Sequence, residues 1–154
     1  MNRIAEEVEQ DQNYWSIMRT LNPEPEATGS DAIAAASHQI ADTLNLKTVA
    51  AWTFSGSTAF RIARERPNST VIALTPSQNT ARRLALVWGV HSIRTKDASD
   101  IDDMAFRACK FALREGYSAV GERIIIVAGM PFGTPGATNM VRIAFIGPEH
   151  AAKA

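Results

Sequence analysis

The sequence contains almost none of the residues from which disulfides and transition-metal sites are built. Its 154 residues include a single cysteine, Cys109, and three histidines, no two of which have the spacing of metal ligands. Cys109 falls among alanines at helical spacing, so we expect it in the core rather than as a nucleophile. An internal disulfide is therefore excluded, and no metal site is predicted.

An excess of charge of one sign is also absent. Sixteen Lys and Arg residues balance sixteen Asp and Glu residues, which gives a formal net charge of zero. Such a balance argues against a binding face for nucleic acid or for an anionic membrane. The sequence also shows no secretory leader and no apolar run of membrane-spanning length. We therefore expect a cytoplasmic protein with no nucleic-acid partner and no membrane partner.

Beyond residue 30, segments typical of buried strands alternate with segments typical of amphipathic helices. With 45% hydrophobic residues, the chain can form one domain with a substantial core. Strands are predicted at residues 47–52, 70–75, 90–94, 123–128 and 139–146. The last two are too close in sequence for a crossover helix between them. The pattern predicts an α/β fold, a three-layer α/β/α open sheet of about five strands, mainly parallel with an antiparallel last strand.

Three of the helices carry recognisable start or stop signals. Ser30 or Asp31 can cap the first helix, and Ser77 opens another that extends to Trp88. Trp88 is aligned with the apolar residues of that helix, so we expect it in the core. A run of aspartates near residue 100 begins a third helix, where carboxylates favour the positive end of the helix dipole. His150 is expected in a frayed tail.

The first 19 residues differ from the rest of the sequence. They are predicted to form one acidic amphipathic helix, with apolar residues spaced along one face. Residues 20–29 contain two prolines and a glycine, which is typical of a linker. We therefore divide the chain into a helix at 1–19, a linker at 20–29, a domain at 30–147 and a tail at 148–154.

The segment between the strand at 47–52 and the next helix is the most informative part of the sequence. Five of its six residues are small, hydroxylated or glycine, namely Thr53, Ser55, Gly56, Ser57 and Thr58. At a helix start, free N–H groups and the positive end of the dipole attract an anion, and a glycine lets the backbone approach it closely. The segment is a candidate phosphate site, although an ordinary serine N-cap would give the same local pattern.

A second loop, rich in glycine and proline, joins the last two strands. Residues 129–138 hold three of the nine glycines and two of the seven prolines in the chain. In open α/β sheets, ligands bind outside the carboxyl ends of the strands, where the strand order reverses. If the strands at 47–52 and 123–128 are neighbours across that reversal, the two loops meet and form two walls of one anion site. Periodicity does not give the strand order, so this arrangement is a hypothesis.

The order of these motifs resembles the C-terminal domain of pyruvate kinases. The motifs that carry the resemblance are Ala50–Ala59, Arg66-Pro67, Val71–Thr75, Thr80–Leu84, Trp88–Val90 and Gly136–Ile143. It extends over nearly the whole chain from about residue 28, and residues 1–9 are similar to the last helix of the catalytic (β/α)₈ barrel. The resemblance implies that the rest of the barrel lies outside this chain, with the residues that hold phosphoenolpyruvate, ADP, K⁺ and Mg²⁺ or Mn²⁺. No cofactor is expected in the chain itself, which is predicted to be inactive alone.

The resemblance implies a regulatory domain that binds a phosphorylated effector and contributes to a tetramer interface. It assigns the effector phosphate to Thr53, Ser55, Gly56, Ser57 and Thr58. It adds a second part of the effector loop, formed by Gly133, Thr134 and Gly136. The form of the loop at 132–136 is similar to that of bacterial members.

Two departures from the family bear on the effector. Members activated by fructose 1,6-bisphosphate carry a tryptophan where this chain has Met130, and an arginine that alignment places at Met104. Loss of a stacking surface and a cation removes contacts for a second phosphate. The comparison favours a monophosphate, such as AMP, ribose 5-phosphate or a hexose monophosphate.

Three functions remain open at this point. The first is a regulatory and interface domain of pyruvate kinase, whose full-length enzyme makes pyruvate and ATP from phosphoenolpyruvate and ADP. The second is a free-standing phosphate-binding module of the same fold, and the third is a purely structural oligomerisation domain. Arg82 and Arg83 either reach an effector or form surface ion pairs, which are the commoner case.

Overall fold

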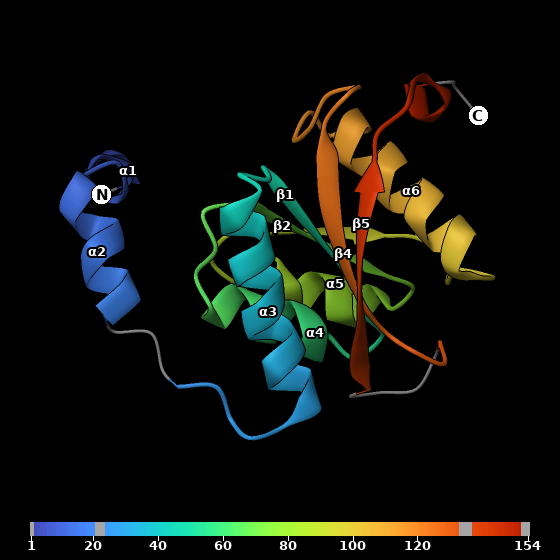
Figure 1. Ribbon diagram of the computed structural model, residues 1–154, viewed down its shortest axis with the longest axis horizontal. Helices are drawn as coiled ribbons and strands as arrows, with labels where there is room; N and C mark the ends of the chain where they lie inside the picture. The colour runs from blue at the N-terminus through green and yellow to red at the C-terminus, as the bar shows by residue number, and fades with distance from the viewer. Residues whose placement is uncertain (1, 21–23, 133–136, 152–154) are drawn as a thin grey trace.

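The computed structural model describes residues 2–20, 24–132 and 137–151, and its main part is an open five-stranded sheet (Figure 1). The strands lie in the order β3-β2-β1-β4-β5, with the first four parallel and β5 antiparallel to β4. Their bounds are β1 (Thr48–Trp52), β2 (Thr70–Thr75), β3 (Val90–Arg94), β4 (Arg123–Gly129) and β5 (Thr138–Phe145). The predicted fold is confirmed, and each strand begins and ends within one residue of its predicted bounds.

The sheet has a helical layer on each face. The helices are α3 (Gly29–Thr43), α4 (Ser57–Arg64) and α5 (Gln78–Leu84) on one face, and α6 (Ile101–Arg114) on the other. The division follows the pleat, because successive side chains of a strand point to opposite faces. In β1, Val49 belongs to the core under α3 and α4, whereas Ala50 belongs to the core under α6. Among the described residues, no helix has both the length and the apolar character needed to cross a bilayer.

The strand order reverses between β1 and β4. The chain moves outward from β1 through β2 to β3, and then returns to place β4 on the other side of β1. The two strands pair in parallel, with Val49 opposite Ile125 and Ala51 opposite Val127. The loops that follow them therefore leave the same edge of the sheet side by side. The predicted neighbourhood of these two strands is confirmed.

The N-terminal segment forms two helices, so the prediction of one helix over residues 1–19 is wrong. The helices are α1 (Asn2–Glu9) and α2 (Gln12–Thr20), and Figure 1 shows both beside the sheet domain. Asp11 separates them, because its carboxylate accepts a hydrogen bond from the Asn13 N–H at 2.7 Å. An aspartate that caps a new helix in this way competes with continuation of the old one.

Two predictions about helix ends need correction. Thr28, rather than Ser30 or Asp31, caps α3, and its hydroxyl accepts a hydrogen bond from the Asp31 N–H. Helix α5 begins after its Ser77 cap as predicted but ends at Leu84, because the chain then turns towards β3. Trp88 therefore lies beyond the helix, outside the core.

The surroundings of Trp88 differ from a hydrophobic core. The Arg66 guanidinium lies 4.2 Å from the centroid of its ring, and the indole N–H donates to the Glu9 carboxylate at 2.8 Å. A cation on the ring face and a carboxylate at its edge are both favourable for an indole. Trp88 thereby connects α1 to the sheet domain.

His150 is also placed differently from the prediction. It lies in a short 3₁₀ helix, Pro148–Ala151, and its side chain is buried rather than frayed. The Nδ1 atom is 3.0 Å from the Gly147 N–H, which donates to it, and the ring lies 5.0 Å from that of Phe106. The chain beyond β5 is therefore attached to α6.

Candidate functional site

The segment after β1 turns sharply at Gly56 and opens α4. Gly56 is the N-cap of this helix and has a φ of +95°, in the left-handed region that favours glycine. A Cβ atom built there would lie 3.3 Å from Thr80 Cγ2 and 3.5 Å from Leu84 Cδ2. Glycine has no side chain to cap the helix, and the Ser57 N–H of the first turn donates to the Ser55 hydroxyl at 3.4 Å instead.

Two of the five predicted phosphate residues, Thr53 and Thr58, are buried and stabilise the loop through hydrogen bonds of their hydroxyls. The Thr53 hydroxyl accepts a hydrogen bond from the Gly56 N–H at 2.9 Å. The hydroxyls of Thr58 and Thr138 share a hydrogen bond of 2.7 Å, and all three threonines are buried. Thr138 follows the glycine- and proline-rich loop, so this bond joins the ends of the two loops. The hydroxyls of Thr53 and Thr58 thus form hydrogen bonds within the protein, and their predicted role towards a phosphate stays a prediction.

The two serines of the segment face outward instead. The hydroxyl of Ser55 donates to that of Ser57 at 3.2 Å, and both side chains are half-buried. The backbone that carries them is held from behind, because the Thr80 hydroxyl donates to the Phe54 carbonyl at 2.9 Å. Two hydroxyls thus lie at the start of α4, on a loop whose shape is fixed by neighbouring threonines.

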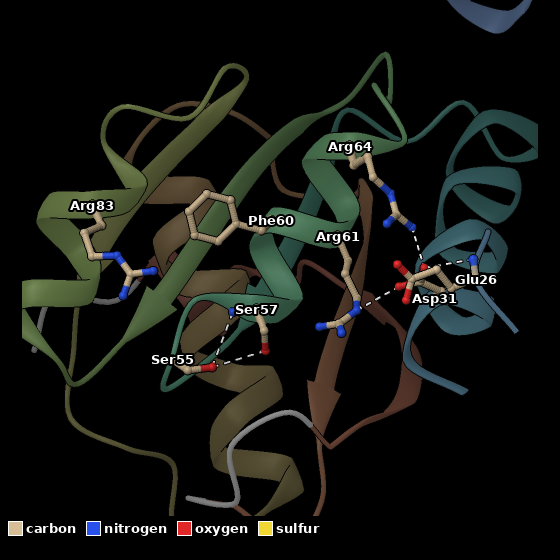
Figure 2. A pocket seen from close by; sticks show the side chains of 8 residues that line it. All are labelled: Glu26, Asp31, Ser55, Ser57, Phe60, Arg61, Arg64 and Arg83. Carbon is tan, nitrogen blue, oxygen red and sulfur yellow. Dashed lines mark hydrogen bonds and ion pairs between the residues drawn. The ribbon is translucent and has the colours of Figure 1, made fainter. Parts of the chain in front are cut away.

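A hollow of about 680 Å³ opens beside these serines. Figure 2 shows its lining residues, which come from the linker, α3, the loop, α4 and α5. They are Glu26, Asp31, Ser55, Ser57, Phe60, Arg61, Arg64 and Arg83. Three guanidinium groups in one hollow at a helix start make a site that favours anions. Arg82, the neighbour of Arg83, is not part of the lining.

Asp31 organises two of the arginines. Its side chain is 1% exposed, and its two oxygens accept from Arg61 Nε at 2.8 Å and Arg64 Nη2 at 2.6 Å. The Glu26 N–H also donates to it at 3.0 Å. The hydrogen bond from Arg64, above all, holds the pKa of the Asp31 carboxyl below its ordinary value, so the group is ionised at neutral pH.

Sequence reasoning missed this cluster. It treated Asp31 as a possible helix cap and gave Arg61 and Arg64 no part in the phosphate site. The spacing of three residues between the two arginines put both on one face of α4, which was the available signal. Nothing local connected them to a carboxylate thirty residues earlier.

The second loop is described only in part. The candidates Gly133, Thr134 and Gly136 lie outside the described residues, so their role stays a prediction. At the start of the loop, Asn139 accepts from the Met130 N–H and donates to its carbonyl, both at 2.8 Å. This pair of hydrogen bonds fixes the position from which the loop departs.

One step in the comparison of effectors is wrong. Met104 is fully buried in α6, on the face of the sheet opposite the hollow. A side chain at that position belongs to the core and cannot contact a ligand beside α4. Met130 lies at the loop, so the absence of a tryptophan there still bears on the effector.

The described parts of the chain contain neither a cluster of metal ligands nor a reactive thiol. Within residues 2–20, 24–132 and 137–151, no three His, Cys, Asp or Glu side chains are grouped as metal ligands. Cys109 is 1% exposed, as predicted for a core residue, and burial raises the pKa of its thiol to about 11. A thiol of that pKa is not a nucleophile at neutral pH.

Comparison with protein families gives a match over most of the chain. The family model described as "Pyruvate kinase, alpha/beta domain" matches residues 31–144. This range contains the whole sheet except the last residue of β5, both loops, and every residue that lines the hollow except Glu26.

Individual relatives extend the similarity to the N-terminal helices. A pyruvate kinase of Methylorubrum extorquens is 66% identical over 154 residues, which are all of this chain and 32% of the relative. One from Agrobacterium vitis is 37% identical over 147 residues, covering 96% of this chain and 31% of the relative. One from Staphylococcus haemolyticus is 39% identical over 151 residues, covering 98% and 26%. The chain thus spans about a third or less of the length of these curated relatives.

Proposed function

The chain belongs to the pyruvate kinase alpha/beta domain family, and we propose that it is the regulatory domain of a cytoplasmic pyruvate kinase. In this proposal the full-length enzyme transfers a phosphoryl group from phosphoenolpyruvate to ADP. The catalytic barrel supplies the sites for K⁺ and for Mg²⁺ or Mn²⁺, and the domain alone is inactive. Its own task is to bind a phosphorylated effector.

The geometry of the loop at 53–58 carries this proposal. Ser55 and Ser57 present two hydroxyls at the start of α4, where Gly56 supplies no side-chain cap and the Ser57 N–H donates to the Ser55 hydroxyl at 3.4 Å. Hydroxyls, N–H groups and the positive end of a helix dipole together favour a phosphate. The arginines of the adjoining hollow add positive charge on the same side.

The effector that we propose is a monophosphate rather than fructose 1,6-bisphosphate. The support is Met130, which supplies no aromatic stacking surface at the start of the second loop. AMP, ribose 5-phosphate and hexose monophosphates are the compounds to test.

The proposed partners are the barrel domain and further copies of the same chain. Helices α1 and α2 expose Ile4, Val8 and Ile17 around a hollow of about 480 Å³, which fits a packing surface for the barrel. The edge strand β5 exposes Ile143 and Phe145, which supports a subunit interface in a tetramer. A purely structural oligomerisation domain would use the same surface, so the phosphate site must be tested separately.

The test is a change of charge at the helix start. Ser57→Asp places a carboxylate where the phosphate would bind, and an acidic residue in the first turn also favours the helix itself. A bound effector at a hundredfold its dissociation constant stabilises a fold by about 2.7 kcal/mol. We expect a sugar phosphate to raise the melting temperature of the unmodified chain and to leave that of the Ser57→Asp variant unchanged.

Val120→Asp is the matched control. Val120 is exposed in the turn before β4, at the opposite edge of the sheet, and its substitution changes the net charge equally. The control should respond to the sugar phosphate like the unmodified chain. An equal response of the Ser57→Asp variant would refute the phosphate site and leave the structural function.

A further inference from the structure

The hollow beside α4 is large enough for much more than one phosphate group. Its volume of about 680 Å³ lies within the range of sites for whole small molecules, about 300–1,000 Å³. The serines occupy one side, and Phe60 is partly exposed between α4 and α5 (Figure 2). The remainder of a phosphorylated ligand would therefore lie against Phe60 and the arginines.

Asp31 holds the Arg61 guanidinium through one of its five N–H donors. Only the Arg61 Nε is bonded to Asp31, at 2.8 Å, whereas a guanidinium has four further N–H donors on its two Nη atoms. Figure 2 shows these atoms on the side of the hollow that holds Ser57. Because Asp31 is buried and also bound by Arg64, it acts as a positioning residue for Arg61.

Arg83 approaches from the other side of Phe60. It comes from α5, and its guanidinium lies 5.9 Å from the centroid of the Phe60 ring. Among the described residues its recorded partner is this ring rather than a carboxylate. Its five N–H donors are therefore available to a ligand in the hollow.

The charges around the hollow are unevenly distributed. Three arginines and two carboxylates line it; the buried Asp31 is shared by Arg61 and Arg64, and Glu65, outside the lining, lies 3.6 Å from Arg64. Glu26 lies at the Asp31 end, away from Arg83 (Figure 2). The region between Arg61 and Arg83 is thus positive beyond the phosphate loop itself.

We propose that the effector carries a second anionic group, and that Arg61 and Arg83 bind it. The inference rests on the proposed phosphate site, since the loop fixes one end of the ligand. The ligand class is a small phosphate monoester with a further negative group. A preference for a monophosphate makes a carboxylate the expected second anion, and a second phosphate is the other source to test.

Two pairs of probes isolate the second anion. Glucose 6-phosphate and 6-phosphogluconate share a six-carbon chain but differ by a carboxylate. Fructose 6-phosphate and fructose 1,6-bisphosphate differ by a phosphate. In calorimetric titrations of the 154-residue chain at constant ionic strength, we expect 6-phosphogluconate, with two anionic groups, to bind about tenfold more tightly than glucose 6-phosphate, as a charge-assisted hydrogen bond provides. A preference for fructose 1,6-bisphosphate alone would identify a second phosphate and would overturn both the carboxylate and the monophosphate effector proposed above.

Arginine variants test the residues. Arg83→Gln and Arg61→Gln should each lower the ratio of the two affinities towards one, while the binding of glucose 6-phosphate stays nearly unchanged. Arg82→Gln, one residue away and outside the hollow, should retain the full preference. Arg83 has no part in the Asp31 network, so its variant remains informative if loss of Arg61 disturbs the fold.

The possible failures are distinct. Equal affinities within both pairs, or a preference that survives both Arg61→Gln and Arg83→Gln, would overturn this inference and leave the phosphate site intact. No binding of any of the four probes would refute the phosphate site, and the inference with it.

Discussion

At both ends of the parallel strands, here called the amino edge and the carboxyl edge of the sheet, buried hydroxyl groups form hydrogen bonds between separate segments of the chain. At the edge where the parallel strands begin, the hydroxyls of Thr48 and Ser118 share a hydrogen bond of 2.8 Å, and Ser69 donates to the Leu46 carbonyl at 2.6 Å. At the edge where they end, Thr58 and Thr138 share one of 2.7 Å. At each edge, buried hydroxyls join segments that are distant in the sequence.

Helix direction makes the edges different. Helices α4, α5 and α6 begin at the carboxyl ends of the strands, so their N–H groups and positive dipole ends lie at that edge. Both edges are hollowed, by about 680 Å³ at the carboxyl edge and about 460 Å³ at the amino edge, where Trp88, His91 and Tyr117 line the space. A hollow is therefore present at both ends of the strands, and the proposed anion site is the one that lies where helices begin.

The largest expected effect is the loss of stability when valine replaces one of two glycines that have similar φ angles. Gly56 and Gly121 have φ values of +95° and +93°, but a Cβ at Gly121 has no atom within 4 Å, whereas one at Gly56 meets three side chains. Gly56→Val should lower the free energy of unfolding by about 3 kcal/mol, from φ strain plus crowding. Gly121→Val should lower it by about 1–2 kcal/mol, from φ strain alone.

Urea denaturation measures both losses, and melts with a sugar phosphate measure the response to ligand. Only Gly56→Val should abolish that response. Equal losses of stability would mean that the loop relaxes around the added side chain, and that its shape is less fixed than its hydrogen bonds indicate.

The next effect compares the hydroxyl pairs. Thr58→Val and Thr138→Val should each cost about 1–2 kcal/mol, since each leaves a buried hydroxyl unpaired. The double variant should cost less than the sum, by about 1 kcal/mol. Thr48→Val and Ser118→Ala at the amino edge should show the same coupling in denaturation.

Ligand binding then distinguishes the two pairs. The changes at Thr58 and Thr138 should also weaken phosphate binding, because this pair joins the ends of the two loops. The changes at Thr48 and Ser118 should not alter it. Weakened binding from the amino-edge pair would show that the edges are coupled through the sheet.

The next effect in size is the pH dependence of stability that Asp31 contributes. Because its pKa is lowered in the folded state, its contribution to stability is complete above the ordinary carboxyl pKa of about 3.9 and is lost as pH falls through the folded value. The difference in melting temperature between the unmodified chain and Asp31→Asn should stay constant from about pH 8 to 5 and narrow below about pH 4. A difference that narrows already near neutral pH would contradict the ionised, doubly paired state.

Glu122 provides the comparison at the amino edge. The hydrogen bond from Lys47 also lowers its pKa, but the Lys47 side chain is 66% exposed. The difference between Glu122→Gln and the unmodified chain should have the same sign with pH and be smaller, because solvent screens an exposed pair.

The parts predicted well from sequence are those with local signals. The strands at 70–75 and 90–94 have the predicted bounds because apolar runs bordered by turn residues leave little freedom. The loop at 53–58 lies between a strand and a helix as predicted, because glycine and hydroxyls there form a short continuous pattern; its role towards phosphate stays a prediction. The neighbourhood of β1 and β4 was a hypothesis that depended on strand order, which only long-range pairing determines.

The parts predicted poorly depend on contacts between distant elements. Asp31, Arg61 and Arg83 come from three helices, and no spacing in the sequence connects them. Trp88 has the periodicity of a core residue, but its helix ends a turn earlier than the apolar pattern. His150 follows the last strand like a tail residue, yet it is held by the Gly147 N–H and the Phe106 ring.

The buried thiol of Cys109 gives this chain a built-in reporter of opening. Its sulfur lies 3.8 Å from the Phe145 carbonyl, between α6 and the edge strand β5. A thiol reagent can reach it only when α6 separates from the sheet, so the labelling rate measures how often that layer opens. The proposed ligand site lies on the opposite face. A sugar phosphate that slows labelling would show that the two helical layers open as one cooperative unit.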